Sequence, residues 1–197
     1  MNLNFKFKGN RNYIQGPDIC NQIFSLYKED FYEDFEISFH SLAHNNIILS
    51  QEQLKQQDQL KFVCKFKQLD NTIKTCYGYE NIFSKPNTSY VYNEEEITDY
   101  AIINLQEKSI ALKQHSVFTP LEEIVALNKY LVSNLFKEQT GKWYFTKLQL
   151  KKPFPKDIKI IKILLKNNFN FLMVKSEIYI ENEFYGNIYF SLKGVSC

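Results

Sequence analysis

The chain has 197 residues and a formal net charge of +2, with 17 Phe and 13 Tyr but only 6 Gly and 5 Pro. This composition excludes a disordered or collagen-like chain and favours a compact, strand-rich protein. Because the basic residues are dispersed, it also excludes the electrostatic footprint of a nucleic-acid-binding protein. No apolar run reaches the length of a membrane span.

The N-terminal segment and the cysteines bear on the compartment. Residues 1–8 alternate between polar and apolar types and lack the apolar core of a signal peptide. The four cysteines have no metal-type spacing, so we expect reduced thiols at Cys20, Cys64, Cys76 and Cys197. The cytoplasm is therefore the expected location.

Alternation of apolar and polar residues predicts the strands of the first half. Their apolar members are Leu3, Phe5 and Phe7; Phe35, Ile37 and Phe39; Leu60, Phe62, Cys64 and Phe66; and Ile73, Thr75, Tyr77 and Tyr79. Gly16-Pro17-Asp18 predicts the start of a helix, because Pro is tolerated in the first turn. The predicted buried stripe of this helix is Ile19, Ile23, Leu26 and Tyr27. The Gln-rich stretch 51–59 is expected to be a loop or a short exposed helix.

The second half begins after a predicted connector over residues 84–98, whose acidic run 94–96 is interpreted as a solvated face. Two strands follow over 99–106 and 109–114. Thr119-Pro120-Leu121-Glu122 then predicts a helix start, with Thr as N-cap and Glu completing a capping box. Ile124, Leu127, Leu131 and Leu135 recur at helical spacing, and Gly141 is a stop signal. The next predicted strand starts at Trp143, and three more cover residues 158–163, 171–180 and 184–192. A tight turn at 181–183 connects the last two.

Two short matches indicate an internal repeat. Cys76-Tyr77-Gly78 and its following residues align with Phe184-Tyr185-Gly186, and residues 25–29 align with residues 134–138. Both pairs lie roughly a hundred residues apart, which predicts a duplicated unit rather than a solenoid. The expected units are residues 1–95 and 96–197. A helix followed by antiparallel strands, made twice, predicts an α+β protein in which each curved sheet wraps around one long helix.

Residues 146–158 carry a more specific pattern. Lys152-Pro153, a short gap and Lys156-Asp157 precede a long apolar strand, and residues 175–190 form a hairpin of apolar alternation. This layout resembles hotdog-fold acyl-thioester dehydratases and thioesterases over roughly residues 99–193. Lys156 stands where those families usually have Gly. Together with the repeat, the resemblance implies a double hotdog, with an acyl chain in a tunnel beside the helix.

The resemblance also implies catalytic residues. In the dehydratase branch, a His just before the central helix acts as acid and base, with help from a carboxylate on a helix, and His115 precedes the helix that begins near Thr119. His suits this role because its pKa lies near neutrality. The family's His-Phe-Pro-Gly loop is absent, and no carboxylate lies mid-helix. Glu122 or Asp18 is the carboxylate expected to activate water if the reaction is hydrolysis.

Polar residues beside the helices are candidates for substrate binding. Tyr13 lies near the position that corresponds to His115, and Asn21 and Asn128 each lie on a helix with one apolar face. Each Asn is expected either to bind a thioester carbonyl or to bond a neighbouring backbone group. His40 and His44 lack a third ligand, so we expect no metal site. With no phosphate-binding Gly loop, no cofactor is expected either.

The leading interpretation is a 3-hydroxyacyl-thioester dehydratase-like enzyme of fatty-acid or polyketide metabolism. The alternatives are an acyl-thioesterase and a non-catalytic acyl-binding or scaffold protein. The expected partner is an acyl carrier protein or acyl-coenzyme A. Two units in one chain can form a pseudo-dimer, and a further homodimer is left open.

Overall fold

The structure is a computed structural model that describes residues 1–55, 57–113 and 116–194. It divides into two compact units. Unit 1 comprises Met1–Tyr92 and Lys151–Pro153, and unit 2 comprises Asn93–Leu150 and Phe154–Cys197. Assignment of residues 151–153 to unit 1 is a feature that the sequence did not predict. No helix among the described residues is long and apolar enough to cross a membrane.

Unit 1 contains one long helix and an antiparallel sheet. Its elements are β1 (Asn2–Leu3), β2 (Phe7–Lys8), α1 (Gly16–Leu26), β3 (Glu33–Phe39), β4 (Ile47–Ser50), the short 3-10 helix η1 (Gln57–Gln59), β5 (Leu60–Lys67), β6 (Ile73–Glu80) and β7 (Ser89–Tyr90). The sheet has the strand order β1-β4-β6-β5-β3, and β2 pairs separately with β7 in parallel. The predictions of α1, β3, β5 and β6 are therefore confirmed, whereas β4 was not predicted, and the strand predicted around Leu3 to Phe7 is two short strands, β1 and β2.

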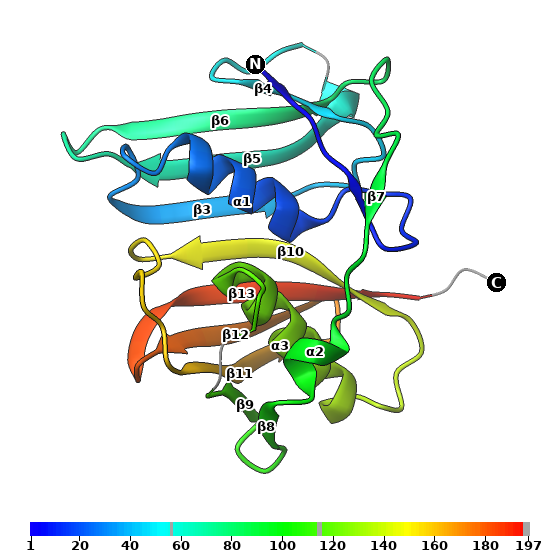
Figure 1. The fold of residues 1–197 in the computed structure, drawn as a ribbon, viewed down its shortest axis with the longest axis vertical. Helices are drawn as coiled ribbons and strands as arrows, with labels where there is room; N and C mark the ends of the chain where they lie inside the picture. Colours follow the sequence, from blue (N-terminus) through cyan, green and yellow to red (C-terminus); the bar gives the residue numbers. More distant parts are fainter. Residues whose placement is uncertain (56, 114–115, 195–197) are drawn as a thin grey trace. The chain divides into compact units, whose positions relative to one another are not determined.

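Aromatic side chains join α1 to the sheet of unit 1. Figure 1 shows α1 lying across β3, β5 and β6, and two ring contacts agree with this placement: Phe24 with Phe35 at 4.7 Å and Tyr27 with Phe66 at 5.1 Å between centroids. Ile19 and Ile23 of the predicted stripe are buried, but Leu26 is 43% exposed. The buried stripe therefore shifts toward Pro17 and Cys20, and the aromatic cluster replaces Leu26 at the end of the helix.

The predicted strand at β6 is present, but its burial follows the predicted alternation only at Tyr79, which is buried. Cys76 and Gly78 are buried, whereas Ile73 is 71% exposed. The cause is the neighbouring strand: Phe62 of β5 lies opposite Gly78, and a β-carbon on Gly78 would come within 2.1 Å of the Phe62 ring. Opposite Phe62 the inner face therefore has no room for a side chain on β6, which explains the glycine at position 78.

A carboxylate fixes the loop before β4. Glu80 pairs with Lys61 at 2.8 Å and accepts hydrogen bonds from the backbone N–H groups of His44 and Asn45. Burial alone would raise the pKa of Glu80, but these bonds outweigh it and hold the pKa below its usual value. Glu80 therefore couples the loop to β6 through its ionised form.

We expect this coupling to weaken in acid. Because the folded-state pKa of Glu80 is lowered, its contribution to stability is present above the unfolded-state value and is lost as the pH falls through the folded-state pKa. Glu80→Gln should lower the free energy of unfolding at neutral pH and flatten its decline in acid, as measured by urea unfolding from about pH 7 to about pH 3. The exposed Glu29→Gln variant is the control. Parallel pH curves for Glu80→Gln and wild type would contradict the assignment.

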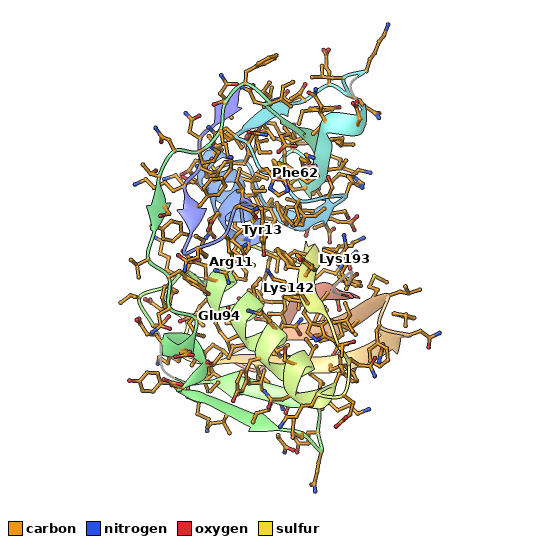
Figure 2. The ribbon with its side chains drawn as sticks, turned by 90° about the vertical axis from the view of Figure 1, so that its right-hand side faces the viewer. Arg11, Tyr13, Phe62, Glu94, Lys142 and Lys193 are labelled. Atoms are coloured by element: carbon orange, nitrogen blue, oxygen red, sulfur yellow. The ribbon has the colours of Figure 1, made fainter. Side chains whose placement is uncertain are left out.

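Unit 2 is larger and has a longer helix. Its elements are α2 (Glu95–Thr98), β8 (Ala101–Asn104), β9 (Ser109–Leu112), α3 (Pro120–Leu135), β10 (Lys142–Leu150), β11 (Ile161–Phe169), β12 (Met173–Ile180) and β13 (Glu183–Lys193). The strand order within the unit is β10-β13-β12-β11-β9-β8, and every pairing is antiparallel. Lys142 and Lys193, at facing ends of β10 and β13, are marked in Figure 2.

Local signals in unit 2 work as predicted. Thr119 and Glu122 form the capping box at the start of α3, and the helix buries Ile124, Leu127 and Leu131 against the sheet. Glu181 and Asn182 both have positive φ and connect β12 to β13 as a two-residue turn of the primed kind that hairpins favour.

The connector departs from the prediction in two respects, because it contains the short strand β7 as well as a short helix. Residues 95–98 form the short helix α2, and Glu94 at its start pairs with Lys129 of α3 at 2.8 Å. Glu95 and Glu96 are exposed, as expected for a solvated face, but Glu94 is half-buried. One member of the acidic run therefore fastens α2 to α3.

The internal repeat matches the elements only in part. Residues 25–29 and 134–138 both contain a helix C-terminus, and Gly78 and Gly186 both lie in the last long strand of a unit. However, β6 lies between β4 and β5, whereas β13 lies between β12 and β10. The strand orders therefore do not support a repeat that holds strand by strand.

Candidate functional site

A buried carboxylate holds the loop that leads into α3. Glu123 is fully buried, and its Oε1 accepts hydrogen bonds from the backbone N–H of Ser116 at 2.9 Å and from the Ser116 hydroxyl at 2.8 Å. The Ser116 Oγ in turn accepts from the N–H of Phe118 at 3.1 Å. These bonds fix the backbone immediately after His115, which itself lies outside the described residues.

The adjacent acid has a different role. Glu122 Oε2 accepts hydrogen bonds from the Thr119 N–H at 3.0 Å and the Thr119 hydroxyl at 2.8 Å, which completes the capping box. Its carboxylate is therefore engaged in helix capping. The sequence did not distinguish Glu122 from Glu123, because both lie in the first helical turn and only the fold determines which one faces the core.

Asn128 is the most unusual polar residue in the core of unit 2. It is fully buried in the middle of α3, and neither its Nδ2 nor its Oδ1 makes a hydrogen bond within the described part of the chain. Most buried polar atoms in proteins are bonded, because an unsatisfied one costs about 1–3 kcal/mol. The amide therefore presents one donor group and one acceptor to an apolar core.

A second polar group faces the same core. Ser176 lies on the inner face of β12 between Val174 and Ile178, is fully buried, and its hydroxyl has no hydrogen-bond partner among the described residues. The sequence analysis did not select Ser176 as a candidate, although it stands at a position of the strand where the alternation calls for an apolar residue. The signal was present, since a Ser at an inward position of a buried strand is itself an anomaly.

Asp18 lies in unit 1, in a cluster of charges and aromatic rings. Its Oδ1 is 3.3 Å from the Nζ of Lys8 and accepts a hydrogen bond of 2.9 Å from the Tyr90 hydroxyl. The Lys8 side chain is only 2% exposed, and its ammonium lies 4.0 Å from the centroid of the Tyr92 ring. Alternation predicted Lys8 on the outer face, and this prediction is wrong because the ammonium pairs with Asp18 in the interior.

The two remaining candidates also lie in unit 1. Tyr13 is half-buried in the loop before α1, close in the chain to Arg11, and both side chains are marked in Figure 2. Asn21 lies on α1 and is half-buried, unlike the fully buried Asn128. The candidates therefore divide between the units: Tyr13, Asp18 and Asn21 in unit 1, and Glu122 and Asn128 in unit 2.

The histidine pair does not form a metal-binding arrangement. His40 follows β3 and is exposed, and the ring Nδ1 of His44 lies 2.8 Å from the backbone carbonyl of Asn12. Among the described residues, no three His, Cys, Asp or Glu side chains come together in a way that would hold a metal ion.

Comparison with known proteins identifies the fold. No protein-family model matches the chain, and no curated protein matches it in sequence. Among solved structures, a tesB protein of Mycobacterium avium subspecies paratuberculosis has a TM-score of 0.50 and 7% identity, over 95% of this chain and 91% of that one. The similar structures are hotdog-fold proteins, which confirms the resemblance at the level of the fold, and the α+β architecture is consistent with it.

Two other solved structures are similar over most of the chain. The pyran synthase domain from module nine of the sorangicin pathway has a TM-score of 0.49 and 5% identity, over 95% of this chain and 92% of that one. A dehydratase domain of a mycocerosic acid synthase-like polyketide synthase has a TM-score of 0.49 and 9% identity, over 94% of this chain and 84% of that one.

Proposed function

We propose that this protein binds a 3-hydroxyacyl thioester beside α3 in unit 2 and acts on it as a dehydratase. The observation that carries the proposal is the buried amide of Asn128, whose donor and acceptor both lack partners in the described chain. A 3-hydroxyacyl thioester supplies the complement, because its carbonyl accepts a hydrogen bond and its hydroxyl donates one. Ser176 offers a further hydroxyl from the opposite side of the same core.

The proposed chemistry uses the loop before α3. His115 removes a proton from the carbon next to the thioester carbonyl and returns it to the 3-hydroxyl, so that the C–O bond breaks and water leaves. Glu123 has a positioning role, because its bonds fix Ser116, the residue that follows His115 in the chain. Asn128 donates to the thioester carbonyl, where negative charge develops in the transition state.

The alternative activities make different demands. Hydrolysis needs a carboxylate that activates water, and the capping box engages Glu122. Asp18 is ion-paired with Lys8 in unit 1. Both observations favour dehydration over thioester hydrolysis. A non-catalytic acyl-binding or scaffold protein is the third candidate. In it the buried amide of Asn128 would bind the acyl group, and His115 would not act as acid or base.

The proposal includes the arrangement of the chain and its setting. We infer two hotdog-like units that form a pseudo-dimer within one chain, with further homodimerisation open, in the cytoplasm. The acyl group would arrive on an acyl carrier protein or on coenzyme A. The division into two compact units, each with one long helix and an antiparallel sheet, supports this arrangement.

Replacing Asn128 separates binding from folding. We expect the free energy of unfolding of Asn128→Leu to equal that of the wild type or to exceed it by up to about 1–3 kcal/mol, because the buried unsatisfied amide is removed. Binding of 3-hydroxyacyl-coenzyme A should fall at least about tenfold, which corresponds to the loss of about 1.4 kcal/mol. Urea unfolding and titration calorimetry measure the two effects, and Asn134→Leu, near the end of the same helix, is the matched control.

Mass spectrometry of the reaction decides among the activities. With a panel of 3-hydroxyacyl and saturated acyl thioesters, on coenzyme A and on carrier protein, loss of water that disappears in His115→Ala supports the dehydratase. Release of free acid would identify a thioesterase instead. Intact thioesters with Asn128-dependent binding would leave the acyl-binding role, and binding that Asn128→Leu leaves unchanged would refute the proposed site.

A further inference from the structure

Three buried thiols of unit 1 lie on α1 and on the sheet, and they have no part in the proposed function. Cys20 is on α1, Cys64 on β5 and Cys76 on β6, and each is fully buried. All three are free thiols. Cys64 lies near enough to the other two for each to raise the pKa of its thiol, so the three form one cluster.

Two of these thiols face each other across neighbouring strands. Cys64 and Cys76 are direct register partners in the antiparallel β5–β6 pair, and both side chains point to the inner face. Directly opposed residues in such a pair have Cα atoms about 4.5–5.5 Å apart. This range lies within the roughly 4.4–6.8 Å that a disulfide requires. Cys20 belongs to another element and has no such register with either residue.

The cluster does not fit the other common use of grouped cysteines. A metal site needs at least three ligands at suitable spacing. Within the described chain no three His, Cys, Asp or Glu side chains meet that requirement, and the three thiols are included in this finding. Dithiol chemistry between the two opposed cysteines is the remaining chemistry that this geometry favours.

Of the two opposed thiols, Cys76 is the one that ionises more readily. Its thiol donates to the Tyr27 hydroxyl at 3.5 Å, and Lys74 lies 4.4 Å from the centroid of the Tyr27 ring. Burial raises the pKa of the Cys76 thiol, but Tyr27 and Lys74 oppose that rise, whereas the pKa of Cys64 is raised well above its usual value by burial and by the other thiols. Cys76 is therefore the thiol expected to ionise first.

The strand around Cys76 is also open on one side. The pairing of β4 with β6 ends at Ser50 and Tyr77, so among the described strands β4 does not extend alongside Cys76. The hairpin beyond it carries two strongly exposed apolar residues, Leu69 and Ile73. Opening of this hairpin end would expose Cys76 without unfolding the rest of the unit.

We propose that Cys64 and Cys76 form a cross-strand disulfide when the protein meets a disulfide oxidant of the glutathione type. The Cys76 thiolate attacks one sulfur of oxidised glutathione, the glutathione S–S bond breaks, and one glutathione thiolate leaves. The Cys64 thiolate then attacks the Cys76 sulfur of the mixed disulfide and releases the second glutathione. Two protein thiols are oxidised, one glutathione disulfide is reduced, and the two thiol protons pass to the two glutathione thiolates.

The bond would tie the two strands that carry Phe62 and Gly78. It closes a loop around the β5–β6 turn, which limits the freedom of the unfolded chain and so stabilises unit 1. It also removes the Cys76 thiol donor from Tyr27. Oxidation should therefore protect unit 1 from unfolding without touching the residues proposed to bind the acyl group.

The test is made on the full chain with Cys197→Ser, which prevents cross-linking through that cysteine. After incubation with excess oxidised glutathione we expect the loss of two hydrogens per chain, a Cys64–Cys76 peptide in the digest, and a higher urea midpoint that reverts on reduction. A urea concentration below the unfolding transition should make this oxidation faster than it is without urea, because the β5–β6 hairpin then opens more often. Cys20→Ser should oxidise like the parent, and Cys64→Ser and Cys76→Ser should not form an internal disulfide.

Three outcomes would overturn the proposal. The first is that no internal disulfide forms even when the protein is refolded in the presence of oxidised glutathione. The second is a disulfide that involves Cys20. The third is a glutathione adduct that persists on Cys76 while Cys64 stays reduced. Refolding with oxidised glutathione covers the case in which the native core excludes the oxidant. None of these readouts depends on acyl binding, so they are independent of the proposed function.

Discussion

Asp18→Asn should destabilise the protein by about 3–5 kcal/mol, because it leaves the buried ammonium of Lys8 without its carboxylate. The substitution preserves the volume of the side chain, so the effect reports the charge rather than a cavity. Urea unfolding followed by circular dichroism measures it. The same experiment decides whether Asp18 is structural or catalytic, since a purely catalytic carboxylate could be neutralised with little change in stability.

Two companion variants complete this test. Replacing both partners by apolar residues, Lys8→Met with Asp18→Leu, should recover most of the loss, because a buried ion pair is often no better than good apolar packing. Glu29→Gln removes one partner of the exposed Lys28–Glu29 pair and should change stability by less than about 0.5 kcal/mol. Wild-type stability of Asp18→Asn together with lost turnover would reverse our interpretation of this cluster.

The second large effect is expected at the two Tyr-Gly sites. At Gly186 a β-carbon would lie 1.9 Å from the backbone carbonyl oxygen of Gln149 on β10, and backbone cannot move aside within a paired strand. At Gly78 the obstacle is the Phe62 ring, which is a side chain. We therefore expect Gly186→Ala to cost more than the roughly 1–3 kcal/mol typical of overpacking, and Gly78→Ala to fall within that range.

A compensating substitution distinguishes the two cases. Phe62→Leu frees space above Gly78. The double variant Gly78→Ala with Phe62→Leu should therefore lose less free energy of unfolding than the two single variants lose in total. No side chain near Gly186 can be shortened to the same end, because Gln149 is met at its backbone. Thermal unfolding of the set measures the coupling, and strict additivity at Gly78 would contradict the steric explanation.

Much of the fold was predictable because its signals are local. The capping box at Thr119 and the tight turn predicted over residues 181–183 depend on residues close in the chain, and both are confirmed, with the turn itself made by Glu181 and Asn182. The errors arose where a distant residue decides the outcome. The face of β6 depends on the Phe62 ring, and the inward turn of Lys8 depends on Asp18.

The candidate site was predictable in its region but not in its chemistry. The sequence selected Asn128, and the structure adds that both of its amide atoms lack partners in the described chain. Glu123 and Ser176 were missed, because burial of a first-turn acid and of a strand Ser follows from helix orientation and sheet register. Neither quantity can be read from residue spacing alone.

The position of β13 has a consequence for the nascent chain. It is the last strand of unit 2 to be synthesised, yet it lies inside the sheet, between β10 and β12. Until the ribosome releases residues 183–193, the facing edges of both neighbours are open and can pair with strands of another chain. The most hazardous interval for aggregation is therefore the time after β10 and β12 have emerged from the ribosome and before residues 183–193 follow, and holdase chaperones would be needed most at that point.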